Sequence, residues 1–420
     1  MKPHDAVVIG AGPAGCAAAL FLAQKGYQPL VLDQAKFPRD KVCGEFISPA
    51  ADDLLDDLGL LARIEAQNPR RLHGVALSAY GDQEVFLDYP PRPDRPGPVT
   101  SLSLPRFWFD RLLVDRVREA GLEVLEERRV TGLMVQDGRV VGVQGWDASR
   151  TPFTLRARVV LDAGGRQSVA IRQFHLRRRA GGKSRVALAA HWRGGPPLRD
   201  YCYMHVSPPG YTGTASVHQG GVNVVLVVDP GVIRGQDLNA VYRRIVLAEP
   251  RRRALLAGAR PVESVRSVDS LAFSVAPAPV GGLLLAGDAM GFLDPFTGEG
   301  IYLSLRSAQV AAAAVDEGLQ QGGVSRRGVQ LYEQARHREF GARFRLSRIL
   351  QRIIYSKRLC RQVMATLARH PSLAAPLIGA IGDYLPAEAV VRPGYLARGV
   401  RAWLATRCRK LPAEAKNQDG

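Results

Sequence analysis

The sequence lacks a long uncharged apolar run, a paired cysteine motif and a leader-like segment. No uncharged apolar run in its 420 residues reaches the length of about 18 residues that a membrane-spanning helix needs. Its five cysteines, Cys16, Cys43, Cys202, Cys360 and Cys408, are scattered and show no metal-ligand spacing. The first residues lack the zones of a signal peptide. We therefore expect a reduced, cytoplasmic protein without a metal, soluble or peripheral to a membrane.

Acidic residues are scarce relative to basic ones. Lys and Arg number 57 against 39 Asp and Glu, which gives a formal net charge of +18. Such an excess favours an acidic partner, an anionic cofactor or a membrane surface through long-range attraction. No helix-turn-helix, zinc-finger or aromatic-interleaved motif accompanies the charge, so we expect no nucleic-acid binding. The length and the ordinary content of 46% hydrophobic residues predict two closely connected globular domains.

The chain opens with a strand, helix and strand in succession. Residues 6–9 form a β-type run, residues 13–25 are helical and rich in small side chains, and residues 29–33 form a second β-type run. This order within about 30 residues is the parallel crossover unit on which dinucleotide-binding sheets are built. The sequence therefore predicts a Rossmann-like domain at the N-terminus.

A glycine fingerprint lies between the first strand and the helix. Gly10 permits a tight turn, Gly12 lets the backbone approach a pyrophosphate, and Gly15 lets the helix pack closely on the strand. The N-terminus of the helix then offers free N–H groups and a positive dipole end to the phosphates. Asp33 ends the second strand, where a carboxylate can accept hydrogen bonds from a ribose. Together these residues predict a dinucleotide site rather than a turn alone.

The middle of the chain is rich in β-type runs, and its end is helical. Residues 184–274, with residues 72–89, predict a mostly antiparallel sheet that a helical stretch at 237–256 interrupts. From about residue 300 the pattern is helical. The remaining predicted elements are a helix at 107–120, a strand at 123–130, a hairpin at 133–144 that turns at Asp137-Gly138, and buried strands at 159–163 and 283–286.

A second glycine and aspartate segment follows the strand at 283–286. Gly287 and Asp288 come directly after the strand, and Gly298 to Gly300 opens a helix. An aspartate at a strand end can bind a second ribose or a ribityl hydroxyl, and a helix N-terminus can stabilise negative charge at the N1 and O2 edge of a flavin. Taken alone, the segment could also be an Asp-capped turn with glycines that allow close packing.

The two segments together resemble the FAD-binding fold shared by class A flavoprotein monooxygenases, geranylgeranyl reductases and flavin-dependent halogenases. The resemblance implies FAD as the cofactor, with its ADP half on the glycine loop and Asp33, its adenine against the backbone of Val130, and its ribityl side on Asp288. Arg106, in SLPRFWFDRLL, matches the arginine that heads a helix and contacts the flavin in these proteins. No second dinucleotide fingerprint is visible, so we expect no separate nicotinamide domain. The candidate sources of reducing equivalents are transiently bound NAD(P)H and a partner reductase.

The fold implied is α/β, and α+β overall. It consists of a Rossmann-like FAD-binding domain, an inserted and mostly antiparallel β-sheet domain for the substrate, and a helical C-terminus. We assign residues 1–70, 101–183 and 275–345 to the FAD-binding domain, residues 71–100 and 184–274 to the substrate domain, and residues 346–420 to the helical C-terminal region.

A third segment, FPRDKVCGEFISP at residues 37–49, resembles a loop of geranylgeranyl reductases and the Gly-Glu pair of halogenases. Arg39 and Lys41 could neutralise phosphate or reduced-flavin charge. Cys43, beside these cations, is a candidate catalytic thiol, and Glu45 is a candidate catalytic carboxylate. The alternative is that Cys43 is a small packed residue and Glu45 a structural hydrogen-bond acceptor.

Residues that are typical of some related families but missing from this chain narrow the choice of reaction. Gly164, in LDAGGRQS, stands where typical hydroxylases have an aspartate, a pattern nearer to the reductases and halogenases. The tryptophan signature and active-site lysine of halogenases are not evident, so halogenation is the least favoured chemistry. The leading interpretation is a monooxygenase that hydroxylates or oxidises a hydrophobic or aromatic substrate, either a small molecule or a tryptophan of a partner protein. The alternatives are a geranylgeranyl-reductase-like saturase of isoprenoid lipids and a flavin-bearing binding or scaffold protein.

The segment at residues 340–367 sets apolar side chains among seven basic ones and predicts one basic amphipathic helix. Such a helix can lie on an anionic membrane or dock an acidic protein. It can also be an ordinary packed helix with a solvated face, because amphipathicity is typical of any surface helix.

Overall fold

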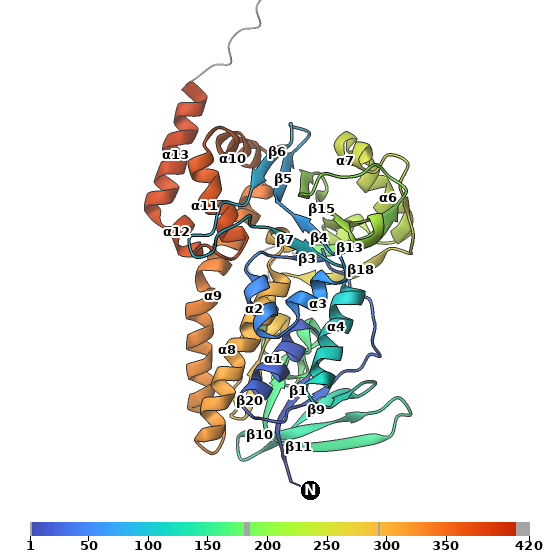
Figure 1. Ribbon diagram of the computed structural model, residues 1–420, viewed down its shortest axis with the longest axis vertical. Helices are drawn as coiled ribbons and strands as arrows, with labels where there is room; N and C mark the ends of the chain where they lie inside the picture. The colour runs from blue at the N-terminus through green and yellow to red at the C-terminus, as the bar shows by residue number, and fades with distance from the viewer. Residues whose placement is uncertain (1, 180–184, 293–294, 409–420) are drawn as a thin grey trace, which may run out of the picture.

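The computed structural model describes residues 2–179, 185–292 and 295–408 of the chain. Figure 1 shows three parts: a lower sheet flanked by helices, an upper sheet on one side, and a group of C-terminal helices on the other. The predicted α/β class with an inserted antiparallel sheet and a helical C-terminus is confirmed. The domain boundaries stay a prediction, and those that fall in 180–184 or 409–420 lie outside the described residues.

The lower sheet is built around β1 (His4–Ile9). Its other strands are β2 (Leu30–Leu32), β8 (Val124–Leu125), β9 (Arg129–Gln136), β10 (Arg139–Trp146), β11 (Pro152–Asp162) and β20 (Leu283–Leu285). The order is β8-β2-β1-β11-β10-β9, with β20 parallel to β11. Val8 lies opposite Val31 on one side and Leu161 on the other, in parallel register. The residues of β1, β2 and β20 at the centre of the sheet are apolar without alternation because both faces are covered, whereas β9 and β10 alternate.

Helix α1 (Pro13–Gln24) packs against α8 (Gly300–Gln320) and α4 (Arg106–Glu119) beside this sheet. Its first ten residues are all buried, and most of their side chains are small, so neighbouring backbones approach closely. Proline at its first position has the backbone angle that a helix start needs. The predicted strand, helix and strand order of the N-terminus is confirmed.

The upper sheet is the inserted one. Its strands are β5 (Gly74–Ala79), β6 (Val85–Asp88), β13 (Arg185–Arg193), β14 (Cys202–Ser207), β15 (Gly210–Val217), β16 (Gly221–Val228), β17 (Arg260–Pro261) and β18 (Arg266–Leu271). All pairs are antiparallel except β14 with β5, which brings the predicted segment at 72–89 into this sheet. Strand β13 alternates: Leu188 and Trp192 face α6 (Leu238–Ala248), whereas Ala187 and Ala189 face the opposite layer, toward the C-terminal helices.

The remaining short elements lie outside the two large sheets. They are β3 (Phe46–Ile47), β4 (Arg70–Leu72), β7 (Ser101–Ser103), β12 (Arg177–Arg179), β19 (Phe273–Val275), β21 (Gly291–Phe292), α2 (Ala51–Asp57), α3 (Leu61–Glu65), α5 (Val169–Gln173) and α7 (Pro250–Leu255). The helical stretch predicted at 237–256 consists of two helices, α6 and α7. The chain extends at Glu249, whose side chain accepts a hydrogen bond from Arg252 N, so α7 starts as a separate helix.

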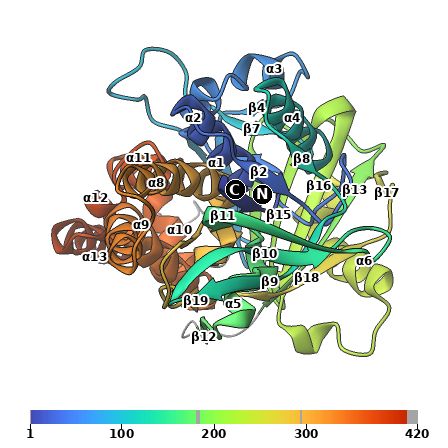
Figure 2. The ribbon, with the colours of Figure 1, turned by 90° about the horizontal axis from the view of Figure 1, so that it is seen from below.

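The C-terminal helices are α9 (Arg326–Ile354), α10 (Lys357–Arg369), α11 (Pro371–Ile381), α12 (Ala387–Val391) and α13 (Pro393–Cys408). Figure 2 shows them gathered on one side of the molecule, away from α6. The single helix predicted at 340–367 is wrong. Helix α9 ends at Ile354, and Ser356 caps α10 by accepting a hydrogen bond from Leu359 N. No helix among the described residues is long and apolar enough to cross a membrane.

The strand predicted at 123–130 is also wrong as one element. It divides into β8 and the start of β9, because Glu127 adopts a left-handed backbone with a φ of 56°. The hairpin of β9 and β10 is confirmed: its turn residues Asp137 and Gly138 have φ angles of 49° and 69°, as a tight hairpin turn requires.

Candidate active site

The glycine loop between β1 and α1 is packed too tightly for side chains. A Cβ on Gly15 would lie 1.7 Å from the carbonyl oxygen of Gly10, and a Cβ on Gly10 would lie 2.6 Å from that of Ala163. Gly12 is different, because its nearest neighbour is the tip of Arg39 at 3.7 Å. Gly12 caps α1 without a side-chain hydrogen bond, so the first N–H groups of the helix face an open groove. This arrangement is typical of a phosphate site.

Asp33 holds the glycine loop in place. Its Oδ2 accepts a hydrogen bond from Ala11 N at 2.7 Å, and its Oδ1 accepts one from Ala35 N at 2.8 Å. The side chain also lines the groove, although the residue is only 8% exposed. Each carboxylate oxygen has a second lone pair, so the contact with a ribose stays a prediction that this position permits.

The groove brings together six of the predicted cofactor residues: Gly10, Gly12, Asp33, Arg39, Lys41 and Val130. Arg39 reaches across it and pairs with Asp110 at 3.2 Å. Sequence reasoning missed further arginines on the walls of the groove, namely Arg128, Arg129, Arg166, Arg172 and Arg177. No spacing rule marks them, because they come from β9, α5, β12 and the turns beside them. Their charge suits an anionic dinucleotide.

A second, apolar cavity adjoins the groove. Its lining includes Cys43 and the other predicted cofactor residues, Arg106, Gly287, Asp288, Gly298 and Gly300. We call the end of the cavity beside Lys41, Cys43 and Arg106 its mouth. Gly15 lines neither cavity and acts by packing alone. Lys41 and Arg166 line both cavities. A ligand can therefore lie along the groove and place one end in the mouth of the apolar cavity.

The charges at the mouth are fixed by pairing. The guanidinium of Arg106 donates two hydrogen bonds to the carboxylate of Asp110, from Nε at 2.7 Å and from Nη2 at 2.8 Å. Burial lowers the pKa of Lys41, the charge of Arg106 lowers it further, and Asp288 opposes this effect. Bidentate pairing of this kind fixes a guanidinium in one orientation. The mouth is thus rigid, cationic and partly dry.

Cys43 and Glu45 are separated only by Gly44 but have different surroundings. Cys43 lines the apolar cavity; its Sγ accepts a hydrogen bond from Glu45 N at 3.3 Å, and its thiol interacts with the guanidinium of Arg106. Asn223 of β16 donates a hydrogen bond to the carbonyl oxygen of Cys43 at 2.9 Å. The inserted sheet therefore positions the predicted thiol beside the mouth.

Glu45 is buried below this loop, outside both cavities. Its Oε1 accepts a hydrogen bond from Arg106 N, and its Oε2 lies 2.8 Å from Nε2 of His191, whose Nδ1 contacts Glu263 at 2.7 Å. Although burial lowers the pKa of His191, the two carboxylates raise it to about 9. These contacts favour the alternative role of Glu45 as a structural acceptor, and its catalytic role stays an untested prediction.

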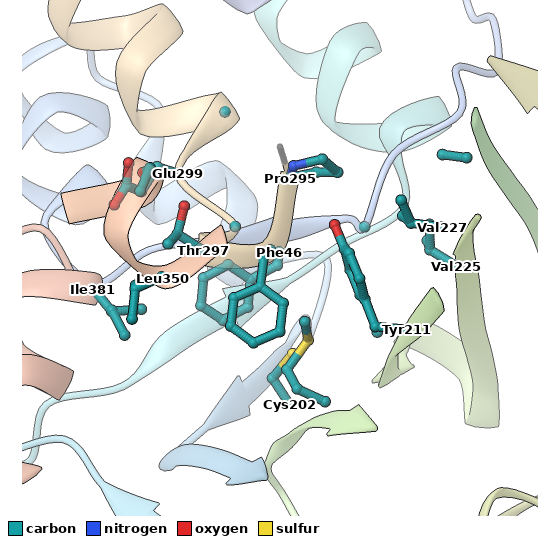
Figure 3. A pocket seen from close by; sticks show the side chains of 18 of the residues that line it. Phe46, Cys202, Tyr211, Val225, Val227, Pro295, Thr297, Glu299, Leu350 and Ile381 are labelled. Atoms are coloured by element: carbon teal, nitrogen blue, oxygen red, sulfur yellow. The ribbon is translucent and has the colours of Figure 1, made fainter. Parts of the chain in front are cut away.

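The far walls of the apolar cavity come from the upper sheet and the C-terminal helices. Figure 3 shows Tyr211, Val225 and Val227 of the sheet opposite Leu350 and Ile381 of the helices, with Phe46 between them. Sequence reasoning did not identify these residues as a site, because aliphatic side chains at such spacing are also typical of a plain core.

Comparison with known proteins decides the family. Residues 4–343 match the family model of the FAD binding domain. The chain belongs to this family. FAD is therefore the cofactor of this FAD-binding protein, and the protein is an FAD-dependent oxidoreductase of the superfamily predicted from the sequence.

Two relatives and one solved structure illustrate the range of the family. The FAD-binding protein is 28% identical to the menaquinone reductase of Mycolicibacterium smegmatis, over 75% of this chain and 76% of that protein. It is 25% identical to digeranylgeranylglycerophospholipid reductase 1 of Methanococcoides burtonii, over 84% of each chain. A flavin-dependent brominase studied as a triple mutant has the same fold, with a TM-score of 0.76 and 18% identity over 97% of this chain and all of that one.

The residues present fit FAD. The uncapped start of α1 and the basic groove suit its diphosphate, and the mouth with Lys41 and Arg106 suits a ring system that becomes anionic on reduction. The individual contacts of the predicted cofactor residues stay predictions that their positions support.

Proposed function

We propose that this oxidoreductase saturates carbon–carbon double bonds in a long apolar chain of the polyprenyl type. The observation that carries the proposal is the cavity that starts at Cys43 and Arg106 and continues between the upper sheet and helices α9 to α11. Its far walls are mostly apolar, with aliphatic, aromatic and sulfur-containing side chains. A chain that enters it gains about 0.8 kcal/mol for each buried methylene group.

The walls favour a substrate by its shape and hydrophobicity rather than by a polar group that it carries. Strands β5 and β13 to β16 contribute one wall, and Ile353, Val363, Leu367 and Ile378 contribute much of the other. Both walls extend away from the mouth, so a flexible chain can lie along them with one double bond at the mouth. The relatives named as reductases of menaquinone and of digeranylgeranylglycerophospholipid act on lipids with isoprenoid chains, which supports the same substrate class here.

Saturation adds one hydride and one proton across the double bond. Reduced FAD supplies the hydride when it is bound. Cys43 is positioned to supply the proton from its Sγ, because it lines the cavity beside the mouth and its thiol interacts with Arg106. Arg106 would then stabilise the thiolate left behind. The dry walls exclude water, which would otherwise compete for the proton.

A second candidate, oxygen insertion into an aromatic substrate, rests on a different observation. The rings of Tyr211 and Phe296 lie edge to face in the cavity, with centroids 5.2 Å apart. Such a pair can hold a third aromatic ring. Because the pair lies inside the cavity, a monooxygenase of this kind would act on a small aromatic molecule rather than on a tryptophan of a partner protein.

The test is anaerobic. Protein with its FAD chemically reduced is mixed with a polyprenyl quinone and with a polyprenyl phospholipid, without oxygen. A saturase oxidises its flavin and forms a product with one double bond fewer. If the flavin stays reduced until oxygen is admitted and oxygen then appears in the product, the protein is a monooxygenase and the proposal is wrong. A requirement for halide as well as oxygen would indicate halogenation.

The thiol is tested separately in the same assay. Cys43→Ala should retain FAD but lose flavin reoxidation by the lipid by about 100-fold or more, as expected for loss of a general acid. Cys202→Ala is the matched control, because this thiol also lines the cavity but lies on β14. It should change the affinity for the lipid rather than the rate at saturation. Equal rates in Cys43→Ala and the unaltered protein would leave Cys43 a packing residue.

A further inference from the structure

Two buried carboxyl groups lie beside the apolar cavity where the loop before α8 meets α9 and α11. Glu299 lines the cavity and is 4% exposed (Figure 3). Asp383, just after α11, is also 4% exposed. Arg343 of α9 pairs through Nη1 with Oδ1 of Asp383 and donates a second hydrogen bond from Nη2 to its carbonyl oxygen at 2.8 Å. Neither the proposed saturation nor the FAD site uses this cluster.

Glu299 is incompletely satisfied. The hydroxyl groups of Thr297 and Ser347 hydrogen-bond to its carboxyl group, but its Oε1 is buried and has no partner among the described residues. A buried polar atom of this kind costs about 1 to 3 kcal/mol unless a ligand or water satisfies it. Glu299, Thr297 and Ser347 all line the cavity, so the unsatisfied oxygen belongs to a polar spot in a mostly apolar surface.

The charges of the cluster do not balance if both carboxyl groups are ionised. One guanidinium faces two carboxylates, and Arg343 is already engaged by Asp383. Burying an unpaired charge is expensive, so one proton must stay in the cluster. Burial raises the pKa of Glu299 well above its ordinary value, and the charge of Asp383 raises it further, whereas Arg343 lowers it. Glu299 is therefore the group that keeps the proton.

The other charged groups near the cluster do not change this balance. The ring of Tyr302 lies under the guanidinium of Arg343 at 5.0 Å, and burial raises the pKa of its hydroxyl to about 12, so it is neutral. Arg306 and Glu339 pair with each other at 2.8 Å. Burial also raises the pKa of Asp383, to about 6, and Arg343 opposes this rise.

We propose that Glu299 presents a protonated carboxyl group to the cavity and donates a hydrogen bond to an uncharged oxygen of the substrate, such as the carbonyl of a polyprenyl quinone. The inference rests on the proposed function in one point only, which is that a long apolar substrate occupies this cavity. A carboxylic acid donates well to a carbonyl oxygen. A phosphate group would need a free cation at this point, but the charge of Arg343 is balanced by Asp383.

The first experiment examines protonation in the holoprotein. Infrared difference spectra at neutral pH, unaltered protein minus Glu299→Gln, should contain the carbonyl band of a protonated carboxylic acid, and adding menaquinone should shift this band. In Asp383→Asn, Arg343 loses its counter-charge, Glu299 should ionise, and the band should disappear although Glu299 is present. Bound FAD in each variant checks the fold. Absence of the band from the difference spectrum of the unaltered protein against Glu299→Gln would overturn the proposal.

The second experiment examines recognition. Quenching of flavin fluorescence measures the binding of menaquinone, of squalene as an all-hydrocarbon polyprene, and of a polyprenyl phospholipid. Glu299→Leu should weaken menaquinone binding by about 10- to 100-fold, the loss expected for one buried hydrogen bond. It should leave squalene binding unchanged. Glu299→Gln keeps an N–H donor at this position and should retain most of the affinity for menaquinone.

Two outcomes would overturn the proposal. Equal weakening of menaquinone and squalene in Glu299→Leu would mean that Glu299 shapes the cavity rather than donating to an oxygen. A phospholipid that binds as tightly as menaquinone, with the same dependence on Glu299, would contradict an uncharged acceptor. If the band shift and the selective binding are observed but no saturated product forms, the proposed reaction fails while the Glu299 subsite stands.

Discussion

The groove and the apolar cavity meet at Lys41 and Arg166 but are built in different ways. The groove depends on a glycine loop whose residues are adjacent in sequence and whose backbone makes the site. The cavity is assembled from side chains of β5, β13 to β16, and α9 to α11, which come from three distant parts of the chain. Changes in the groove should therefore act on FAD binding and folding, whereas changes in the cavity should act on substrate choice.

The most severe change in the groove is Gly15→Ala. Its Cβ would lie 1.7 Å from the carbonyl oxygen of Gly10, and backbone atoms cannot move aside without separating α1 from β1. We expect loss of bound FAD and a loss of unfolding free energy of about 3 kcal/mol or more, at the upper end for overpacked cores. Flavin absorption and the thermal midpoint measure both. Gly399→Ala in α13, where a Cβ meets nothing within 4 Å, is the control and should be neutral or slightly stabilising. FAD retained in Gly15→Ala would contradict the packing argument.

Gly12→Val should separate FAD binding from folding. The nearest atom to a Cβ at this position is Arg39 Nη2 at 3.7 Å, so the fold has room for the side chain, but the pyrophosphate does not. We expect a colourless protein with unchanged circular dichroism, and a thermal midpoint equal to that of the unaltered protein stripped of FAD. A yellow Gly12→Val protein would mean that the phosphates lie elsewhere.

The difference between the two regions also explains what the sequence could predict. The glycine loop, Asp33 and the Gly287-Asp288 segment could be predicted because each requires a residue type at a fixed distance from a strand or helix end, whereas Arg106 was assigned from the family resemblance alone. The aliphatic walls and the partners of Glu299 were not found, because their meaning depends on which distant segments meet. Glu299 itself was overlooked between Gly298 and Gly300, since its burial and its lack of a counter-charge exist only in the folded chain.

Outside both regions, His191 joins the loop at residues 37–49 to the upper-sheet region. It connects Glu45, below the mouth, to Glu263 of the upper-sheet region, and its pKa is raised from about 6.5 to about 9. Because the folded protein binds this proton more tightly than the unfolded chain does, the proton stabilises the fold fully below about pH 6.5. This stabilisation is lost as the pH rises through about 9. His191→Gln should therefore flatten the fall in thermal midpoint across this interval. His218→Gln, whose ring contacts the backbone oxygen of Asn68, is the control and should keep the fall. An unchanged slope in His191→Gln would mean that other groups titrate.

Local breaks account for the errors in the predicted elements. The helix predicted at 340–367 has a continuous amphipathic pattern, yet Ser356 starts a new helix and redirects the chain. The strand predicted at 123–130 is interrupted at Glu127, a residue with no marked turn preference. Periodicity identifies the buried face of an element, but it does not locate a break that one cap or one left-handed residue introduces.

The smallest expected effect concerns the C-terminal helices. The sequence predicts that the basic segment at residues 340–367 either contacts a membrane surface or an acidic protein, or packs as an ordinary helix, and α13 extends the same basic region. Leu396, Val400 and Leu404 of α13 are 43%, 53% and 49% exposed and lie one turn apart. Residues 340–408 contain 12 basic and 2 acidic side chains. If polyprenyl substrates reach the cavity from a bilayer, α13 should bind anionic vesicles, with about 1 kcal/mol from each basic residue near the surface.

The double change Val400→Ser and Leu404→Ser should weaken co-sedimentation with phosphatidylserine vesicles severalfold, and raised salt should weaken it further. Neutral phosphatidylcholine vesicles are the control surface and should bind little of either protein. Turnover of a detergent-solubilised substrate should not change, because both residues lie outside the two cavities. Equal binding of the unaltered and changed proteins would mean that the exposed apolar side chains of α13 do not contact the vesicles, which would favour an acidic protein as the partner of this basic region. The cavity walls would then select the substrate without any help from a membrane contact of α13.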